Sequence, residues 1–343
     1  MRNPFKKIKS CNKMLEENGV CGFKKFIVFF DLIYCKKRFH ATYNEYFLYN
    51  FQNLKNSVRK NYLLTYHQRA KYPLVDGDFE RKLGSGKDKQ YMLFEDMLKR
   101  EWFNVKAENL SEVESFIKKH GKVVFKPVHG SKGRGIFSVS AEEIDTKLAE
   151  CISKITEEEY ICEEYLVQHP KMNEMNPNSV NTVRIMTLCD GKNVKIISAA
   201  LRTATDNNVC DNISTGGFGA AVDIETGVIF STGCDAKKNR YSYHPVSNAK
   251  IKGFTIPYWN ETKEMVKDGA LRINKTAIVG WDIAISSDGP CFIEANNRPA
   301  GRPAQISSEK PCGEEIIKYI NKNKRKYYKK MPKGIKQLQK KYG

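Results

Sequence analysis

The chain has 343 residues, of which 41% are hydrophobic and 28% charged, and its formal net charge at pH 7 is +19. These proportions are typical of a folded globular protein and exclude an intrinsically disordered one. No apolar run reaches the roughly 18 residues that suggest a membrane span. The N-terminal segment MRNPFKKIKS lacks an apolar signal core, so we expect a cytoplasmic protein.

The positive charge is concentrated at the two ends of the sequence. Residues 1–60 contain 13 Lys or Arg against 4 Asp or Glu, and residues 318–343 contain 11 Lys or Arg and no acid. The middle of the chain is therefore close to neutral. The basic tail is either a solvated helix and a frayed end or a surface that attracts nucleic acid or an anionic membrane. Because the middle does not share this charge, we expect no specific nucleic-acid partner, and only peripheral contact with an anionic membrane.

The ten cysteines are scattered singly, and no CxxC pair occurs. The six histidines are equally isolated. A zinc site or a disulfide framework is not indicated, and reduced, mostly buried thiols are the simpler interpretation.

The sequence before residue 122 has a helical pattern. Residues 1–75 are rich in aromatic side chains and Lys, and the apolar run Phe26–Tyr34 (FIVFFDLIY) is expected to be a buried helix. A polar, glycine-bearing junction follows at residues 76–89, and YMLFEDMLKREW then has apolar residues at helical spacing.

From Lys122 the pattern changes to strands joined by short turns. Hairpins are predicted where DGKN joins TVRIMTLCD to VKIISAALR, around residues 225–227, and around residues 287–289. Helices are expected at 141–155, 257–272 and 312–330. Mainly antiparallel hairpins with interspersed helices indicate an α+β architecture.

The stretch VVFKPVHGSKGRGIFSVS, residues 123–140, holds a glycine-rich loop between two apolar runs. A Walker loop or a dinucleotide-binding turn would lead into a helix, whereas this loop leads into a second strand-like run. A glycine-rich β-hairpin that covers phosphates remains, since glycines let backbone N–H groups approach phosphate oxygens closely. A plain surface hairpin turn is the alternative.

Lys126 lies in the apolar strand before this loop, where an unpaired ammonium would be costly. A bound anion explains its presence. Protein kinases also combine a strand lysine with a glycine-rich hairpin, but there the loop precedes the lysine, and this sequence has no HRD or DFG triplet.

Two carboxylates are expected to meet across the hairpin near the C-terminal end. With a three-residue turn at 287–289, Asp282 faces Glu294, and Asn296 lies on the same face as Glu294. Like charges placed opposite each other destabilise a sheet unless a cation lies between them. Oxygen ligands of this kind suit Mg²⁺ in a nucleotide site. A solvated face is the alternative.

Arginines occupy two apolar strands between these motifs. Arg184 lies within TVRIMTL, and Arg202 ends IISAALR. A buried arginine implies an anionic ligand or a carboxylate partner. The loop DNISTGGFG adds Asn212 and paired glycines. Taken with Lys126 and the carboxylate hairpin, these residues indicate a triphosphate site, although each could also be part of a structural salt bridge.

The order of these motifs resembles the ATP-grasp superfamily, in particular its sugar-transfer-associated branch. The matching segments are DK (residues 88–89), VVFKPVHGSKGRGI, EEYLVQHP, NSVNTVRIMT, NISTGGFGAAVD and VGWDIAISSDGPCFIEANNRP, which span roughly residues 80–305. The resemblance implies an ATP-grasp fold of two α+β subdomains that grip ATP. It divides the chain into a helical basic region at 1–75, an ATP-grasp domain at 76–310 and a basic helix and tail at 311–343. Within the domain, the lid subdomain would occupy about 120–165 and the catalytic subdomain about 166–310.

The resemblance also implies a role for individual residues. Lys89 and Lys126 would contact the phosphates, and Glu163, Glu164, Tyr165 and Leu166 would form the hinge whose backbone contacts adenine. The loop that closes over the phosphates would comprise Gly130, Ser131, Lys132, Gly133, Arg134 and Gly135. His169 or Gln168 would hold the ribose. Arg184, Arg202 and Asn212 would act on the reacting groups, and Asp282, Glu294 and Asn296 would hold the metal. Trp281 stands where the family often has a small or basic residue, which would alter the fit of the substrate.

The chemistry implied is ATP-dependent activation of a carboxylate as an acylphosphate, with Mg²⁺ (or Mn²⁺ in its place), followed by attack of an amine or another nucleophile. The branch implies a role in cell-surface polysaccharide or glycoconjugate synthesis, with an acidic sugar or an amino acid as the substrate. A small-molecule or sugar kinase on the same fold and a non-catalytic nucleotide-binding protein are the alternatives.

Overall fold

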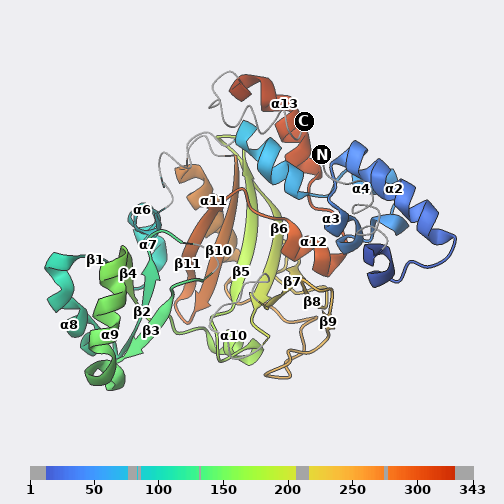
Figure 1. Ribbon diagram of the computed structural model, residues 1–343. Coiled ribbons are helices and arrows are strands. Elements are labelled where there is room, and N and C mark those ends of the chain that lie inside the picture. The colour runs from blue at the N-terminus through green and yellow to red at the C-terminus, as the bar shows by residue number, and fades with distance from the viewer. Residues whose placement is uncertain are drawn as a thin grey trace.

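The computed structural model describes residues 13–75, 83, 86–130, 133–205, 216–273 and 277–328. Figure 1 shows three parts side by side: a small sheet with two helices, a large sheet in the middle, and a group of N-terminal helices at the other side. The mixed helices and sheets confirm the predicted α+β class, and every pair of neighbouring strands is antiparallel.

The large sheet has the strand order β11-β10-β5-β6-β7-β8-β9. Its strands are β5 (Thr182–Cys189), β6 (Val194–Thr203), β7 (Phe218–Val222), β8 (Gly233–Asp235), β9 (Arg240–Tyr241), β10 (Ile278–Ser286) and β11 (Gly289–Asn297). The predicted hairpins at DGKN, at 225–227 and at 287–289 all occur. One face of this sheet packs on helix α11 (Trp259–Arg272), and α10 (Pro170–Met175) precedes β5.

Trp281 lies in the core beneath this sheet. Its side chain is 1% exposed, and its indole Nε1–H donates to Thr187 Oγ1 at 2.9 Å. It packs so closely on α11 that a Cβ at Gly269 would lie 2.8 Å from the ring. The expectation that Trp281 alters the fit of the substrate is therefore wrong. Alternation along β10 turns this side chain away from its neighbour Asp282 and into the apolar layer.

The small sheet has the order β1-β4-β2-β3. Its strands are β1 (Trp102–Val105), β2 (Lys122–Pro127), β3 (Phe137–Ser140) and β4 (Tyr160–Glu164). It packs on α8 (Leu110–His120) and α9 (Ile144–Glu157), which are preceded by the 3₁₀ turns η4 (Ala107–Asn109) and η5 (Ala141–Glu143). The sheet begins at Trp102, earlier than about residue 120, where the sequence placed the lid. Helices α6 (Lys87–Leu93) and α7 (Glu95–Leu98) connect it to the large sheet.

The N-terminal region consists of short helices around an aromatic core. They are α2 (Lys24–Phe39), α3 (Tyr43–Leu48), η1 (Phe51–Asn53), α4 (Asn56–Arg59), the π-helix η2 (His67–Lys71) and η3 (Tyr72–Leu74). Its core includes Tyr46, Phe51 and Tyr62, and it extends to Cys234 and Ile306 of the large-sheet body. These apolar contacts make the N-terminal region an integral part of the fold.

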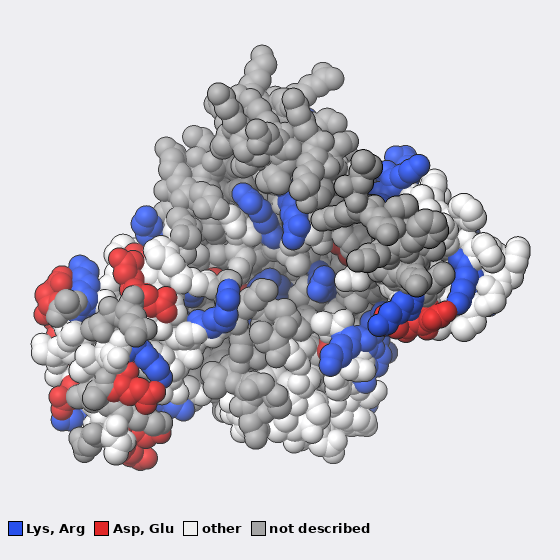
Figure 2. Space-filling model, viewed as in Figure 1, with Lys and Arg blue, Asp and Glu red and all other residues white. Residues whose placement is uncertain are grey.

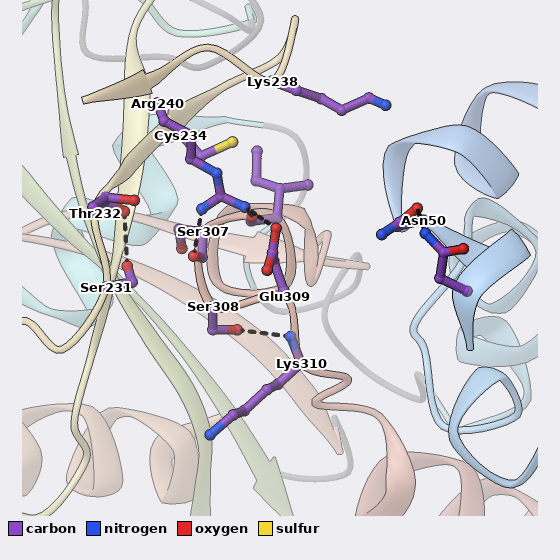
Figure 3. Close-up of polar contacts among 12 residues, drawn as sticks. Asn50, Ser231, Thr232, Cys234, Lys238, Arg240, Ser307, Ser308, Glu309 and Lys310 are labelled. Carbon is purple, nitrogen blue, oxygen red and sulfur yellow. Dashed lines mark hydrogen bonds and ion pairs between the residues drawn. The ribbon is translucent and has the colours of Figure 1, made fainter. Parts of the chain in front are cut away.

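Polar contacts reinforce this attachment next to α12 (Arg302–Ser308). Figure 3 shows Arg240 reaching the end of α12, where its guanidinium donates to the carbonyls of Ile306 and Ser307 at 3.0 and 2.8 Å. A cation at these unpaired carbonyls stabilises a helix end. Lys238 extends toward the N-terminal helices in the same view, and its ammonium donates to the Phe47 carbonyl at 2.9 Å.

Helix α13 (Glu314–Tyr328) closes the fold at the C-terminal side. Its residues Ile316 and Ile320 pack with Leu74 and with Met186 of β5. The three helices predicted at 141–155, 257–272 and 312–330 thus appear as α9, α11 and α13. Among the described helices, none is both long and apolar enough to cross a membrane.

Residues 26–34 form a helix as predicted, but the expectation that this helix is buried is wrong. In α2 only one face packs on the aromatic core, through residues such as Leu32 and Cys35. Phe26 and Phe30 on the other face are 65% and 67% exposed. The run is apolar on both faces, so its periodicity could not show which face would remain in solvent.

Candidate functional site

The two carboxylates predicted to face each other do so. Asp282 of β10 and Glu294 of β11 are register partners, which confirms the predicted pairing. The connection is a two-residue turn, however, because Ser286 pairs with Gly289, and a bulge after Asp282 shifts the register by one residue. The shorter turn and the bulge compensate each other, so both carboxylates remain opposite.

Asp282 is buried between two arginines. Arg184 makes a bidentate ion pair with it from β5, and the NH1 group of Arg202 on β6 donates to both carboxylate oxygens at 3.2 and 3.3 Å. Burial alone would raise the pKa of Asp282, but the two guanidinium charges outweigh burial and hold the pKa below its ordinary value. Asp282 is therefore ionised, and it holds both arginines at the site.

Glu294 is the opposite case. Its carboxylate makes no hydrogen bond or ion pair with any residue that the structure describes. Burial and the neighbouring charge of Asp282 raise its pKa above the ordinary value, although Lys87, Arg184 and Arg202 act in the other direction. The nearby amide of Asn296 donates to Asp282 Oδ2 at 3.4 Å, which leaves its carbonyl oxygen as an acceptor. An enclosed carboxylate without a partner is suited to bind a cation.

The oxygen atoms around Glu294 are of the kind that binds Mg²⁺. The described residues contain no group of three His, Cys, Asp or Glu side chains arranged to hold a metal. Within the part of the chain that the structure describes, Glu294 and the Asn296 carbonyl oxygen provide two free hard ligands, and Asp282 adds a second carboxylate when it exchanges a bond from Arg184 or Arg202 for the ion. Such a set suits Mg²⁺ when phosphate oxygens and water complete the coordination, as is usual for this ion in nucleotide sites.

Lys126 of β2 belongs to a buried polar cluster in the small sheet. Its ammonium forms an ion pair with Glu163 of β4, and Glu163 also accepts from Arg100 at 2.9 Å and from the Tyr91 hydroxyl at 2.6 Å. Burial would raise the pKa of Glu163, but Arg100 and Lys126 lower it to about 2. Burial lowers the pKa of Lys126. The Glu163 carboxylate therefore offsets the cost of burying the Lys126 ammonium, and a bound anion would offset it further.

Helix α6 brings a lysine that the sequence argument did not identify. The ammonium of Lys87 donates to the carbonyls of Pro127 and Gly130 at 3.1 and 3.4 Å, at the start of the glycine-rich loop. Burial lowers its pKa, and Glu294 and Lys126 both act on it. Lys89, which the resemblance assigns to the phosphates, is exposed and has no side-chain contact with the site among the described residues.

We expect these two lysines to differ in a direct test. Lys87→Ala should raise the KM for ATP by about 10- to 100-fold, which corresponds to one charge-assisted hydrogen bond. Lys89→Ala on the same helix should leave it within about twofold of wild type. Steady-state kinetics with ATP as the varied substrate measure both. The reverse order of effects would restore Lys89 as the phosphate-binding residue.

The glycine-rich loop joins β2 to β3, which pair as a hairpin as predicted. Gly133 and Gly135 have φ of 72° and 75°, in the region that favours glycine. A Cβ at Gly135 would lie 2.7 Å from Pro127, so the turn also requires glycine for space. Arg134 is exposed at this turn. Ser131 and Lys132 lie outside the described residues, as does Asn212.

The segment assigned to adenine connects the two sheets. The Tyr165 amide donates to the Lys122 carbonyl at 3.1 Å, while Leu166 packs against Ala284 and Cys291 of the β10–β11 hairpin. Glu164 ends β4, and its amide donates to the Glu101 carbonyl. The backbone of this segment is thus held between the sheets, and its contact with adenine stays a prediction.

The two candidates for the ribose lie just after this hinge. Gln168 is buried, and its amide group bonds to Ser179 and Asn181 and to other nearby groups. It is committed to the fold and is a poor candidate for the ribose. His169 caps α10 by accepting from the Lys171 amide through Nδ1, and it remains a prediction.

The lysines of the small-sheet side and the carboxylates of the large sheet lie within range of one another. Glu294 acts electrostatically on both Lys87 and Lys126. Figure 2 shows blue Lys and Arg side chains gathered in the middle of the face, between the small sheet and the N-terminal region. Five cations (Lys87, Arg100, Lys126, Arg184 and Arg202) interact in this region with three carboxylates (Glu163, Asp282 and Glu294). This excess of positive charge favours a polyanionic ligand.

The residues that sequence reasoning missed lie on one face of α6. Lys87, Gln90 and Tyr91 have the spacing of a single helix face, whereas Lys89 points elsewhere. Gln90 accepts from the Ala295 amide at 2.8 Å, next to Glu294. The apolar pattern of YMLF could have shown which face is buried and therefore which lysine turns inward.

Two antiparallel sheets joined by the Tyr165–Leu166 segment, with Lys87 and Lys126 on one side and the paired carboxylates on the other, have the architecture of the ATP-grasp fold. The model of the sugar-transfer-associated ATP-grasp family matches residues 57–318. The chain belongs to this family. No curated protein matches it.

Several solved structures are similar to this chain, each at low sequence identity. The ATP-grasp ligase PsnB, in complex with a phosphomimetic variant of its minimal precursor, Mg and ADP, is 14% identical, with a TM-score of 0.44 over 71% of this chain and 60% of that chain. D-alanyl-alanine synthetase A from Vibrio cholerae is 10% identical, with a TM-score of 0.44 over 70% and 65% of the two chains. Carboxyaminoimidazole ribonucleotide synthase from Aspergillus clavatus, with ATP, is 11% identical, with a TM-score of 0.42 over 65% and 46%. This chain covers less than two thirds of each of these proteins.

Proposed function

We propose that this protein is an ATP- and Mg²⁺-dependent ligase that activates a carboxylate for attack by an amine or another nucleophile. The observation that carries the proposal is the unpartnered carboxylate of Glu294, which lies opposite Asp282 and within range of Lys87 and Lys126. Mg²⁺, when bound there by Asp282, Glu294 and Asn296, neutralises charge on the transferring phosphoryl group.

The residues of the chain supply the remaining steps. Lys87 and Lys126 bind the phosphates, and the glycine-rich loop covers them. An oxygen of the substrate carboxylate forms a bond to the terminal phosphorus of ATP, and the bond to ADP breaks. An amine then attacks the acyl carbon, phosphate leaves, and the amine loses a proton. Arg184 and Arg202 stabilise the developing anions. Positioning and charge stabilisation carry the rate, since no covalent intermediate with the enzyme is needed.

The substrate and its pathway are the finer part of the proposal. The family description and the excess of cations support an acidic sugar or an amino acid in cell-surface polysaccharide or glycoconjugate synthesis. A cytoplasmic site of action is part of the same proposal.

The decisive experiment measures phosphate release from ATP against a panel of carboxylates and amines, with the mass of each product determined. Hydroxylamine added in place of the amine should yield a hydroxamate, because it traps an acylphosphate. A phosphate ester that hydroxylamine leaves unchanged would identify a kinase instead. ATP binding without turnover on any substrate would favour a non-catalytic nucleotide-binding protein.

A further inference from the structure

Helix α2 presents an apolar stripe to solvent that the proposed catalytic function does not use. The stripe, defined here as the outer stripe of α2, comprises Phe23, Phe26, Ile27, Phe30 and Tyr34, which are 79%, 65%, 59%, 67% and 43% exposed. Their spacing is that of one helix face. Together they expose roughly 600 Å² of side-chain surface, at the upper end of the largest apolar patches on ordinary monomers.

The inner face of α2 explains why the outer stripe is not needed for folding. Leu32 and Cys35 are fully buried on the inner side. Asp31 accepts two hydrogen bonds from Arg59, at 2.7 and 2.6 Å, and a third from the Tyr46 hydroxyl at 2.7 Å. The helix is thus held chiefly through its inner face, and of the outer stripe Tyr34 also accepts a hydrogen bond from the Asn56 side chain at 3.1 Å.

The exposed charges that α2 itself carries beside the outer stripe are of one sign. Lys24 and Lys25 lie at the start of α2, and the basic residues Lys36, Lys37 and Arg38 lie in its last turn. Asp31 is the only acid of the helix, and it is turned inward to Arg59. In Figure 2 the edge of the molecule where Figure 1 places α2 is largely white and is bordered by blue side chains, with red ones beside them on its lower side.

We propose that α2 docks on an anionic lipid surface, with the outer stripe inserted among the lipids and the flanking cations at the headgroups. An amphipathic helix with aromatic residues on one side and Lys or Arg beside them binds in the plane of a membrane interface. Lys and Arg side chains extend their charged ends to the headgroup level while their stems stay apolar. The 16 residues of α2 suit a helix that lies on the surface.

Charge complementarity favours lipid over the other possible occupants. A second copy of the chain, docked through the same stripe, would bring basic helix ends together without acids to pair them. The nearby acids Glu16 and Glu17 already pair with Lys25 and Lys13. Residues 1–12 carry four Lys or Arg and no acid, so their charge does not suit this surface either.

Co-sedimentation of the full chain with phosphatidylcholine vesicles, with and without phosphatidylglycerol, tests the proposal. Wild type should bind the anionic vesicles, and Phe26→Ser/Phe30→Ser should lower the partition coefficient at least tenfold. The matched control Phe230→Ser/Tyr243→Ser removes two exposed aromatics elsewhere and should bind as wild type does. A chain ending at Tyr328 separates the contribution of the basic tail, and it should remain sensitive to the same two substitutions.

Should the Phe26→Ser/Phe30→Ser variant not fold, Lys37→Glu/Arg38→Glu provides a second test, with an expected loss of at least tenfold on anionic vesicles. Equal binding of wild type and the folded serine variant, or no binding by wild type, overturns the proposal. So does a dimer in sedimentation velocity that the serine substitutions abolish while vesicles are not bound. ATP turnover without lipid is measured in parallel, so that a failure of the catalytic proposal is distinguished from a failure of this one.

Discussion

Replacing Glu294 with Gln should reduce ATP turnover by at least about a thousandfold while leaving the protein as stable as wild type or more stable. The activity falls because the substitution removes a carboxylate assigned to the metal and the phosphoryl group. The stability does not fall, because Glu294 has no hydrogen-bond or ion-pair partner among the described residues. Phosphate release and thermal unfolding measure the two effects.

The pH dependence of this effect has a definite sign. Burial and Asp282 raise the folded-state pKa of Glu294, so its ionised form destabilises the folded protein. This cost appears as the pH rises through the raised pKa. The stability advantage of Glu294→Gln should therefore be present at neutral pH and absent in acid, where wild-type Glu294 is protonated. Glu225→Gln, at an exposed turn, is the matched control and should change neither activity nor stability. Full activity of the Glu294→Gln variant would refute the site assignment.

Replacing Asp282 with Asn should abolish turnover and also destabilise the protein, by about 3–5 kcal/mol. Asp282 is 4% exposed and pairs with both Arg184 and Arg202, so an amide would remove the carboxylate that the two guanidinium groups share. Chemical denaturation at neutral pH measures the loss. Asp288→Asn in the exposed turn of the same hairpin should change stability by less than about 0.5 kcal/mol.

For Asp282 the pH dependence has the opposite sign. Its pKa is lowered in the folded protein, so its contribution to stability is present above the ordinary pKa of 3.8 and is lost as the pH falls through the lowered pKa. The difference between wild type and Asp282→Asn should therefore shrink in strong acid. If the Asn variant were as stable as wild type at neutral pH, the ion pairs with Arg184 and Arg202 would not be stabilising.

The hairpin shows how far sequence reasoning could reach into the site. Counting residues placed Asp282 opposite Glu294, and the structure agrees, although the turn has two residues and not three. The count succeeded because the bulge restores what the shorter turn removes. Turn length and bulges depend on local backbone geometry and on packing, which residue types alone do not determine.

The sequence shows where a lysine motif lies, but not which of two neighbouring lysines faces the site. The segment KDK offers two lysines, and only the packing of α6 on β11 through Gln90 shows that Lys87 faces inward. Lys126 was recognised as a costly buried charge, but Glu163 on the adjacent strand was assigned only a backbone role. A partner on another strand becomes visible only when the strand order is known.

The same limit applies to α2. Its sequence is apolar on both faces, and burial of one face followed from contacts with residues such as Tyr46, which lies in a different helix. The helix could be predicted from the sequence, but its exposed side could not.

The position of Arg100 limits how the two sheets can move relative to each other. The guanidinium of Arg100 donates to Glu163 in the small sheet at 2.9 Å and to the Phe292 carbonyl in the large sheet at 2.9 Å. This one side chain therefore connects the two sheets at a fixed point. Any rotation of the small sheet about this point displaces atoms in proportion to their distance from it. Lys126, in contact with Glu163, lies close to this connection and would move little when the small sheet rotates about it. The Lys126 ammonium is thus a fixed part of the site, whichever way the small sheet turns.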